Sequence, residues 1–318
     1  MVVVLVSCAK ASTDTHDTRF MMGTLVSFTV VGVEEEDAER AIQEAANEMQ
    51  RVEHIFTIYG SGDNAVKQFN RTPPHTVVAL DAELDALLQL SVQIQQQSHG
   101  AFNPALGALN LLWGFSQEPA PVKPPSEQKI DDIIGGIKGC LHHSEKGWWR
   151  DSNVCQLDFG GIAKGYAIDR GIMVLKQHGI QNAMINAGGD MRLIGKHGDQ
   201  PWRIGIRHPR DEKKMLGVLA LQGDVSVVTS GDYERFFWDK EVRYHHILDA
   251  TTGYPSQQSQ SVTVVAENAT LADGWSTAMF VMGEKKVANL SPHAIQFLRV
   301  NSAGQSFHSQ GWSALVQP

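Results

Sequence analysis

The chain has 318 residues, of which 42% are hydrophobic and 19% are charged. This length and hydrophobic content allow a large buried core, built as one large domain or as two closely packed lobes. The formal net charge of −8 argues against nucleic acid as the main partner, because no long Lys/Arg cluster offsets the acidity. No interior stretch reaches the roughly 18 apolar residues that a membrane helix needs, so none is expected in the body of the chain.

The first residues resemble the end of a bacterial lipoprotein signal. An apolar run ends in a small residue and a cysteine, and Leu5-Val6-Ser7-Cys8 matches a lipobox. A basic start is absent and the apolar run is shorter than the roughly 7–15 residues of a signal. We therefore expect residues 1–18 to be a truncated lipoprotein signal and polar tether, with the lipid on Cys8 and the protein in the periplasm at the inner membrane. A first β-strand or a frayed end is the alternative.

Strands and helices then alternate without internal repeats. The pattern predicts a strand over residues 23–31 and a helix over residues 34–56 with an apolar stripe. Asp81 should cap a second helix that Gly100 ends, and a third should run from about Ala163 to Gly179. A proline-rich connection is expected over residues 118–126. Short strands are predicted at 183–187, 191–194, 202–207, 215–221 and 261–266.

This order of elements favours an α+β fold over a doubly wound one. We expect a single large domain over residues 19–318, made of two intimate lobes around a mixed, largely antiparallel sheet. Cys140 and Cys155 are the remaining cysteines. They pair in an oxidising compartment or stay as buried thiols, and their spacing does not decide between the two.

The segment from Asp158 to Arg170 carries the first chemical signal. A carboxylate precedes two glycines that open a helix, and Lys164 lies in the first helical turn. Free backbone N–H groups and an ammonium group at a helix start suit a phosphate. The plainer interpretation is an N-cap at Asp158 and a surface lysine. Asp158-Phe159-Gly160 also spells a kinase motif, but no glycine-rich phosphate loop or His-Arg-Asp loop precedes it.

The segment from Leu271 to Ala278 carries the second signal. Asp273 and Thr277 are four residues apart, so a helix places them on one face. An acid and a hydroxyl suit a hard metal ion, although Asp273 follows Thr270 by three residues and could serve only as part of a cap. His246 is a third candidate among 13 histidines, because a neutral imidazole can take a proton from a hydroxyl.

These segments and several others occur in the order found in the ApbE flavin transferases, which the chain resembles over most of its length. Members cleave FAD and attach FMN through its phosphate to a Thr or Ser of a target protein. The shared segments lie at residues 22–24, 101–104, 112–115, 158–170, 186–190, 229–233, 246–249 and 272–277. No single segment is decisive, but the ordered set is specific.

The resemblance implies a role for each candidate residue. His246 would be the catalytic base, and Mg²⁺ would be held by the side chains of Asp273 and Thr277 and by the carbonyl of Gly161. The positions that line the flavin nucleotide in relatives are Met22, Tyr59, Ala101, Phe102, Asn103, Asp158, Lys164 and Ile247. Ordinary core packing is the plainer role for Met22, Phe102 and Ile247.

The chain departs from the family pattern at three places. Asn103 stands where many relatives have Asp, and Ala250 stands where most have proline after the His246 motif. The turn after Tyr59 is one residue longer than usual. These changes affect adenine recognition and loop rigidity more than the proposed base.

The resemblance therefore implies an enzyme that uses FAD as a substrate and an acceptor protein as its partner. Subunits of sodium-pumping NADH:quinone oxidoreductases and related electron-transfer proteins are the acceptors in this family. A Mg²⁺-dependent FAD pyrophosphatase is an alternative, in which water replaces the hydroxyl. A non-catalytic flavin-binding or trafficking protein is the other, although such a protein would be expected to have lost Asp273, Thr277 or His246.

Overall fold

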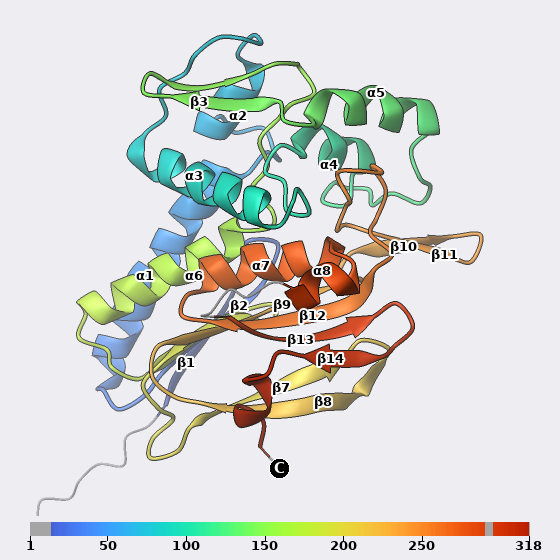
Figure 1. The fold of residues 1–318 in the computed structure, drawn as a ribbon. Helices are drawn as coiled ribbons and strands as arrows, with labels where there is room; N and C mark the ends of the chain where they lie inside the picture. The colour runs from blue at the N-terminus through green and yellow to red at the C-terminus, as the bar shows by residue number, and fades with distance from the viewer. Residues whose placement is uncertain (1–13, 290–294, 318) are drawn as a thin grey trace, which may run out of the picture.

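A computed structural model describes residues 14–289 and 295–317, and its centre is one antiparallel sheet (Figure 1). The sheet has eight strands in the order β1-β2-β5-β6-β9-β12-β13-β14, and every neighbouring pair is antiparallel. The strands are β1 (Thr15–Met21), β2 (Thr24–Val30), β5 (Ala183–Ala187), β6 (Asp190–Ile194), β9 (Val225–Gly231), β12 (Ser259–Ala266), β13 (Gln296–Asn301) and β14 (Ser306–His308). The expected α+β class with a largely antiparallel sheet is confirmed.

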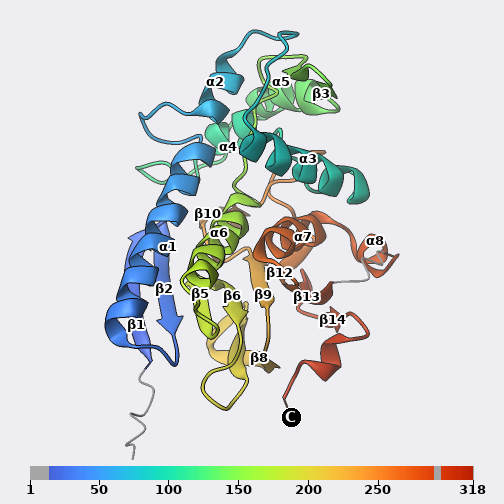
Figure 2. The same cartoon turned by 90° about the vertical axis from the view of Figure 1, so that its left-hand side faces the viewer.

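Three helices cover one face of this sheet: α1 (Glu35–Phe56), α6 (Ala163–Gln177) and α7 (Ala269–Val281), with the short α8 (Glu284–Asn289) after them (Figure 2). The predicted apolar stripe of α1 is buried. Small residues let the helices approach closely. A Cβ on Gly171 of α6, for example, would lie 3.0 Å from the sulfur of Met49 in α1.

A separate hairpin covers the opposite face of the sheet. It consists of β7 (Trp202–His208) and β8 (Asp211–Leu221), and the short 3-10 turn η1 (Trp312–Ala314) lies beside it (Figure 1). Alternate residues of β7, Trp202, Ile204 and Ile206, are buried against the sheet. The strand expected at residues 202–207 thus packs with the period of two that a strand with one buried face has.

A second lobe sits at one end of the layered part, at the top of both ribbon views (Figure 2). It contains α2 (Ala65–Arg71), α3 (Ala82–Gln97), α4 (Gly107–Trp113), α5 (Glu127–Ile137), β3 (Leu141–Ser144) and β4 (Gly147–Arg150). Asp81 caps α3 as predicted, because its side chain accepts from the N–H groups of Glu83 and Leu84. A third hairpin, β10 (Phe236–Asp239) with β11 (Val242–His245), projects beside this lobe.

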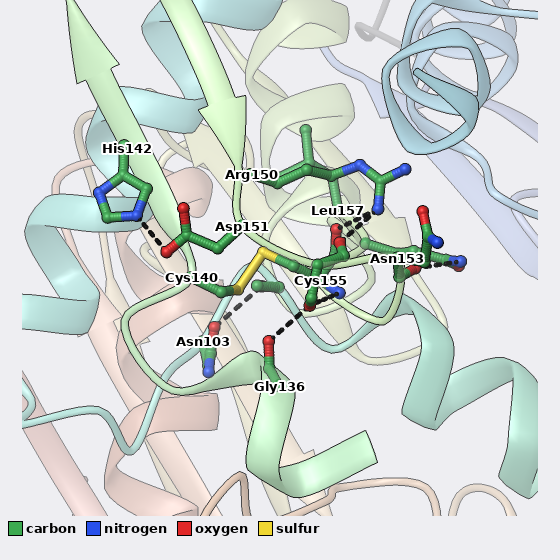
Figure 3. The surroundings of a disulfide bond; sticks show 12 residues. Asn103, Gly136, Cys140, His142, Arg150, Asp151, Asn153, Cys155 and Leu157 are labelled. Carbon is green, nitrogen blue, oxygen red and sulfur yellow. Dashed lines mark hydrogen bonds and ion pairs between the residues drawn. A yellow bond between two sulfur atoms is a disulfide. The ribbon is translucent and has the colours of Figure 1, made fainter. Parts of the chain in front are cut away.

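Cys140 and Cys155 form a disulfide inside the second lobe (Figure 3). The bond joins the start of β3 to the segment that leads from β4 to Asp158. The buried Arg150 holds the same segment by donating to the carbonyls of Ser152 and Cys155, and it also donates to those of Asn70 and Thr72 at the end of α2. The question that the cysteine spacing left open is thereby answered.

Of the N-terminal segment expected to be a signal and tether, residues 1–18, only residues 14–18 are described. Strand β1 begins at Thr15, so the last residues of the expected tether, 15–18, pair with β2. Their outward side chains are polar, which explains why the segment reads as a tether. Cys8 and the lipobox lie outside the described residues. Within residues 14–289 and 295–317, no helix is both long and apolar enough to cross a bilayer.

Candidate active site

A cavity of about 430 Å³ lies where the second lobe meets the sheet and its helices. Its walls come from the β1–β2 turn, the loop before α4, the start of α6, the end of β9 and both ends of the β10–β11 hairpin. Every site residue expected from the sequence lines it: Met22, Tyr59, Ala101, Phe102, Asn103, Asp158, Gly161, Lys164, His246, Ile247, Asp273 and Thr277. Residues spread over 256 positions of sequence thus share one cavity.

The start of α6 brings Lys164 into the cavity beside an acid that the sequence analysis did not select. The Lys164 ammonium forms an ion pair with the buried Asp190, whose other oxygen accepts from the N–H of Thr229 at 3.0 Å. Burial opposes the charged ammonium, but the carboxylates of Asp190 and Asp273 raise the pKa of Lys164 above its usual range. Lys164 is therefore a fixed positive charge at a helix N-terminus, a setting that suits a phosphate.

Asp273 is held by the neighbouring helix and does not cap its own. The cap of α7 is Asn268, whose side chain accepts from the N–H of Leu271 at 2.9 Å. Asp273 instead accepts from the N–H of Gly165 in α6, also at 2.9 Å. Burial, followed by repulsion from Asp190, raises the pKa of Asp273 to about 7. A carboxylate that is costly to ionise in the free protein is well suited to gain from a bound cation.

Two of the three expected metal donors, Gly161 and Thr277, lie side by side, and Asp273 precedes Thr277 by one turn of α7. A Cβ built on Gly161 would lie 3.3 Å from the Thr277 hydroxyl, so the backbone of Gly161 borders that side chain. The Thr277 hydroxyl lies 3.4 Å from that of Ser230, which also lines the cavity. Within residues 14–289 and 295–317, no group of three or more His, Cys, Asp or Glu side chains is arranged to hold a metal. One carboxylate, one hydroxyl and one carbonyl fit Mg²⁺, which keeps water and substrate oxygens as its remaining ligands.

Two adjacent histidines have different surroundings. His245 ends β11 and is buried, and its ring pairs with the carbonyl of Ser256 at 2.8 Å and the N–H of Ile247 at 3.3 Å. His246 lines the cavity, and its buried Nδ1 has no hydrogen-bond partner in the described part of the chain. Burial, with the nearby charges of His245, Arg235 and Lys164, lowers the pKa of His246 to about 3. His246 is therefore a neutral imidazole at the cavity wall, with a buried ring nitrogen that has no hydrogen-bond partner among the described residues.

The β1–β2 turn supplies another wall in a strained conformation. Met22 and Gly23 form a two-residue hairpin turn, and both have positive φ, 54° and 69°. Such a turn matches the twist of the strands but is unusual for a residue with a long side chain. The N–H of Met22 donates to Glu53 at 2.9 Å, which anchors the turn to α1.

Asp158 and Tyr59, two of the residues expected to line the flavin nucleotide, lie in a further part of the cavity wall. Asp158 is buried and accepts from the Asn110 amide at 2.5 Å and the N–H of Gly160 at 2.8 Å. Burial raises the pKa of Asp158 above its usual range despite these bonds. Burial and the Asp158 charge likewise raise the pKa of Tyr59 to about 12. Both groups are thus polar contacts in a cavity wall that carries many other polar side chains.

Eight polar lining residues were not selected by the sequence analysis: Thr24, Asn110, Ser116, Asp190, Thr229, Ser230, Glu234 and Arg235. Asp190 and Ser230 fall inside segments that the resemblance had already marked. Glu234 and Arg235 directly follow the segment 229–233, and this position was the only sequence signal that could have marked them as site residues. Asn110 had no such signal, because only the fold brings α4 to Asp158.

Comparisons with known proteins agree with this geometry. The model of the ApbE family matches residues 22–297. The crystal structure of an ApbE protein from Thermotoga maritima superimposes with a TM-score of 0.87 at 32% identity, covering 96% of this chain and 100% of that one.

Two relatives compared by sequence are each named as an FAD:protein FMN transferase. The protein from Treponema pallidum is 33% identical over 270 residues, which are 79% of this chain and 73% of the relative. The protein from Rhodobacter capsulatus is 31% identical over 304 residues, or 92% of this chain. The alignment covers 57% of that longer relative.

Proposed function

The chain belongs to the ApbE family and is a flavin transferase, and we propose that it moves FMN from FAD to a Thr or Ser hydroxyl of an acceptor protein with Mg²⁺, releasing AMP. The observation that carries this proposal is the convergence in one cavity of an ammonium, a candidate hard-metal set and a neutral histidine. Each matches a need of phosphoryl transfer to a hydroxyl.

The diphosphate of FAD needs neutralising charge. Lys164 and the start of α6 support binding at one side, because the ammonium and the helix N-terminus both favour an anion. Asp273, Thr277 and the Gly161 carbonyl would hold Mg²⁺, which when bound supplies further charge neutralisation at the phosphates. The expected roles of Met22, Phe102, Asn103 and Ile247 in flavin or adenine contact are supported by their positions in the cavity wall.

His246 is the candidate base for the acceptor hydroxyl. Its imidazole is neutral and its Nδ1 has no partner in the described residues, so a ring nitrogen is available to receive a proton. The hydroxyl oxygen then forms a bond to the FMN-side phosphorus, and the bond from that phosphorus to the AMP oxygen breaks. In the pyrophosphatase alternative, water takes the place of the hydroxyl at the same position.

We also propose that the enzyme works in the bacterial periplasm, anchored to the inner membrane through Cys8. Two features support this. The segment Leu5-Val6-Ser7-Cys8 matches a lipobox. The Cys140–Cys155 disulfide is typical of an oxidising compartment. Labelling with a radioactive fatty acid, and its loss in a Cys8→Ser variant, tests the anchor.

The function is tested by incubating the enzyme with FAD, Mg²⁺ and the soluble threonine-bearing domain of a sodium-pumping NADH:quinone oxidoreductase subunit. Intact mass of the acceptor and AMP are followed together. A mass gain of one FMN with matching AMP supports transfer. AMP and free FMN with an unmodified acceptor favour the pyrophosphatase, and no AMP with tight FAD binding favours a binding protein.

A further inference from the structure

The β10–β11 hairpin exposes large aromatic side chains beside the cavity. Phe236 is 40% exposed and Trp238 is 56% exposed. Both lie on β10, two residues apart, so they share the outer face of a hairpin that projects from the body (Figure 1). Exposed aromatic side chains grouped in this way are typical of surfaces that contact another protein.

The outer face is well ordered by its own contacts. Arg243, opposite Trp238 on β11, places its guanidinium 4.4 Å from the Phe236 ring centre and 5.0 Å from that of Trp238. The other face is packed inward, because Phe237 stacks on Tyr244 at 5.3 Å and on Phe115 at 5.6 Å. The inner face of the hairpin is thus packed against the body, and its outer face is exposed to solvent.

Both ends of this hairpin lie in the cavity wall. Arg235 directly precedes β10 and His246 directly follows β11, and the His246 N–H donates to the Arg235 carbonyl at 3.1 Å. By strand register His246 lies on the face of Phe237 and Tyr244, so a polypeptide on the outer face would reach the candidate base only around the base of the hairpin. Within the described residues the hairpin is a sheet of two strands, so its edge groups are free to pair with an added extended segment.

A second exposed pair flanks the same cavity. Phe20 and Leu25 face each other across β1 and β2, are 75% and 62% exposed, and adjoin the Met22–Gly23 turn. Arg235 links the two hairpins, because a Cβ on Gly23 would lie 3.2 Å from its guanidinium. Apolar groups therefore stand on two sides of one cavity.

The base of the β10–β11 hairpin carries excess positive charge. The guanidinium groups of Arg210 and Arg243 share the single carboxylate of Asp232. A carboxylate on a bound segment would complement this charge next to the aromatic rings.

We propose that the outer face formed by Phe236, Trp238 and Arg243 is the docking surface for the acceptor protein. The acceptor contacts it through an extended segment that carries an apolar side chain and a carboxylate near the modified Thr or Ser. This inference rests on the proposed function, because it assigns the site its protein substrate. The hydroxyl reaches His246 from the base of the hairpin.

The test compares wild type with the double variant Phe236→Ser/Trp238→Ser, using the same oxidoreductase domain as acceptor. Initial rates of FMN attachment give the acceptor KM, fluorescence gives the FAD Kd, and interferometry gives acceptor binding to the FAD-loaded enzyme. We expect the double variant to raise the acceptor KM and Kd at least about tenfold and to leave the FAD Kd within about twofold of wild type. Phe236→Tyr/Trp238→Tyr should keep acceptor affinity, and Val77→Ser, an exposed apolar position beside β4, should change nothing.

The outcomes separate this inference from the proposed function. An unchanged acceptor KM and Kd in the double Ser variant overturns the docking surface even if transfer proceeds. If wild type releases AMP without modifying the acceptor, transfer fails, and the binding curves alone decide the surface. Weaker acceptor binding by the double variant then supports it, and equal binding, or none to wild type, overturns it.

Discussion

The carboxylate of Asp273 in α7 accepts a hydrogen bond from the backbone N–H of Gly165 in α6, with a distance of 2.9 Å. This bond joins the two sequence segments that carry most of the chemistry. It forms because the helices cross closely at Gly165, where a Cβ would lie 2.1 Å from the carbonyl oxygen of Ala269. Asp169 of α6 strengthens the junction by accepting from the N–H groups of Ala269 and Thr270 at the start of α7.

Gly165→Ala should therefore damage both stability and activity. The added methyl would meet a backbone oxygen and also lie 2.8 Å from the Cβ of Asp273, and so the helices must separate. Overpacking of this kind typically costs about 1–3 kcal/mol. Denaturant unfolding and Mg²⁺-dependent AMP release measure the two effects.

Gly135 offers a matched control for that substitution. It lies in helix α5, and a Cβ there would meet no atom within 4 Å. Gly135→Ala should leave activity unchanged and add about 0.4–1 kcal/mol of stability, because the unfolded chain loses freedom. If Gly165→Ala behaves like Gly135→Ala, the close helix crossing does not position Asp273.

Asp273→Asn should abolish metal dependence while improving the stability of the metal-free protein at high pH. The folded-state pKa of Asp273, about 7, is raised above its usual value by burial and by Asp190. A raised pKa contributes stability at low pH that is lost as the pH rises through about 7. The neutral Asn avoids that loss, so the variant should exceed wild type in melting temperature above pH 7 without divalent metal.

Activity and metal response give the second readout for Asp273→Asn. We expect a loss of roughly 10²–10³-fold in turnover, the usual scale for losing charge stabilisation at a transition state. Mg²⁺ should raise the melting temperature of wild type and leave that of the variant unchanged. An equal Mg²⁺ response in both proteins would remove Asp273 from the metal site.

Local sequence patterns predict the long helices and several strands, but they do not predict the short or polar strands. The first long helix was predicted within one residue of its bounds because its apolar positions repeat with helical period. Strand β1 was missed because Thr15, Asp17 and Arg19 make its sequence polar. Its strand conformation comes from pairing with β2 and not from a pattern in its own residues. Strands β10 and β11 have only four residues each, too few for a periodic signal.

The candidate site shows the same division. Residues within the resembling segments were predicted to meet, and they line one cavity. Asp190 was missed as a partner of Lys164 because their ion pair depends on how α6 packs over the sheet. Arg235 reaches the turn at Gly23 from more than two hundred positions away, and no local pattern encodes that contact.

Loss of the Cys140–Cys155 disulfide should weaken both stability and FAD binding. The cysteines are 15 positions apart, and closing a loop of that length is worth about 3 kcal/mol. Asp158 follows Cys155 by three residues, so loosening this segment should also raise the FAD Kd. Unfolding of wild type and of Cys140→Ser/Cys155→Ser, each with and without reductant, measures the effect. Reductant should act on wild type alone, and equal stability of all four samples would contradict the prediction.

Alanine substitution of the two adjacent histidines should have different effects: one variant should lose catalytic rate and the other should lose stability. His246→Ala should still bind FAD and Mg²⁺ but lose roughly 10²–10⁴-fold in rate, the usual share of a general base. His245→Ala removes the bond to the Ser256 carbonyl and leaves buried polar groups unpaired, so it should cost about 1–3 kcal/mol of stability. The folded His245 variant should retain most of its turnover.

The pH dependence of kcat/KM distinguishes His246 from an ordinary exposed histidine. Burial and nearby positive charges lower its pKa to about 3, so the imidazole of the free enzyme stays neutral down to about pH 4. Wild type should therefore show no acid limb due to His246 between about pH 5 and 8, a window in which a histidine of ordinary pKa would titrate. A limb near pH 6.5 that disappears in His246→Ala would mean that solvent reaches this ring. A wild-type rate for His246→Ala, or a greater loss of turnover in folded His245→Ala, would assign the base to another residue.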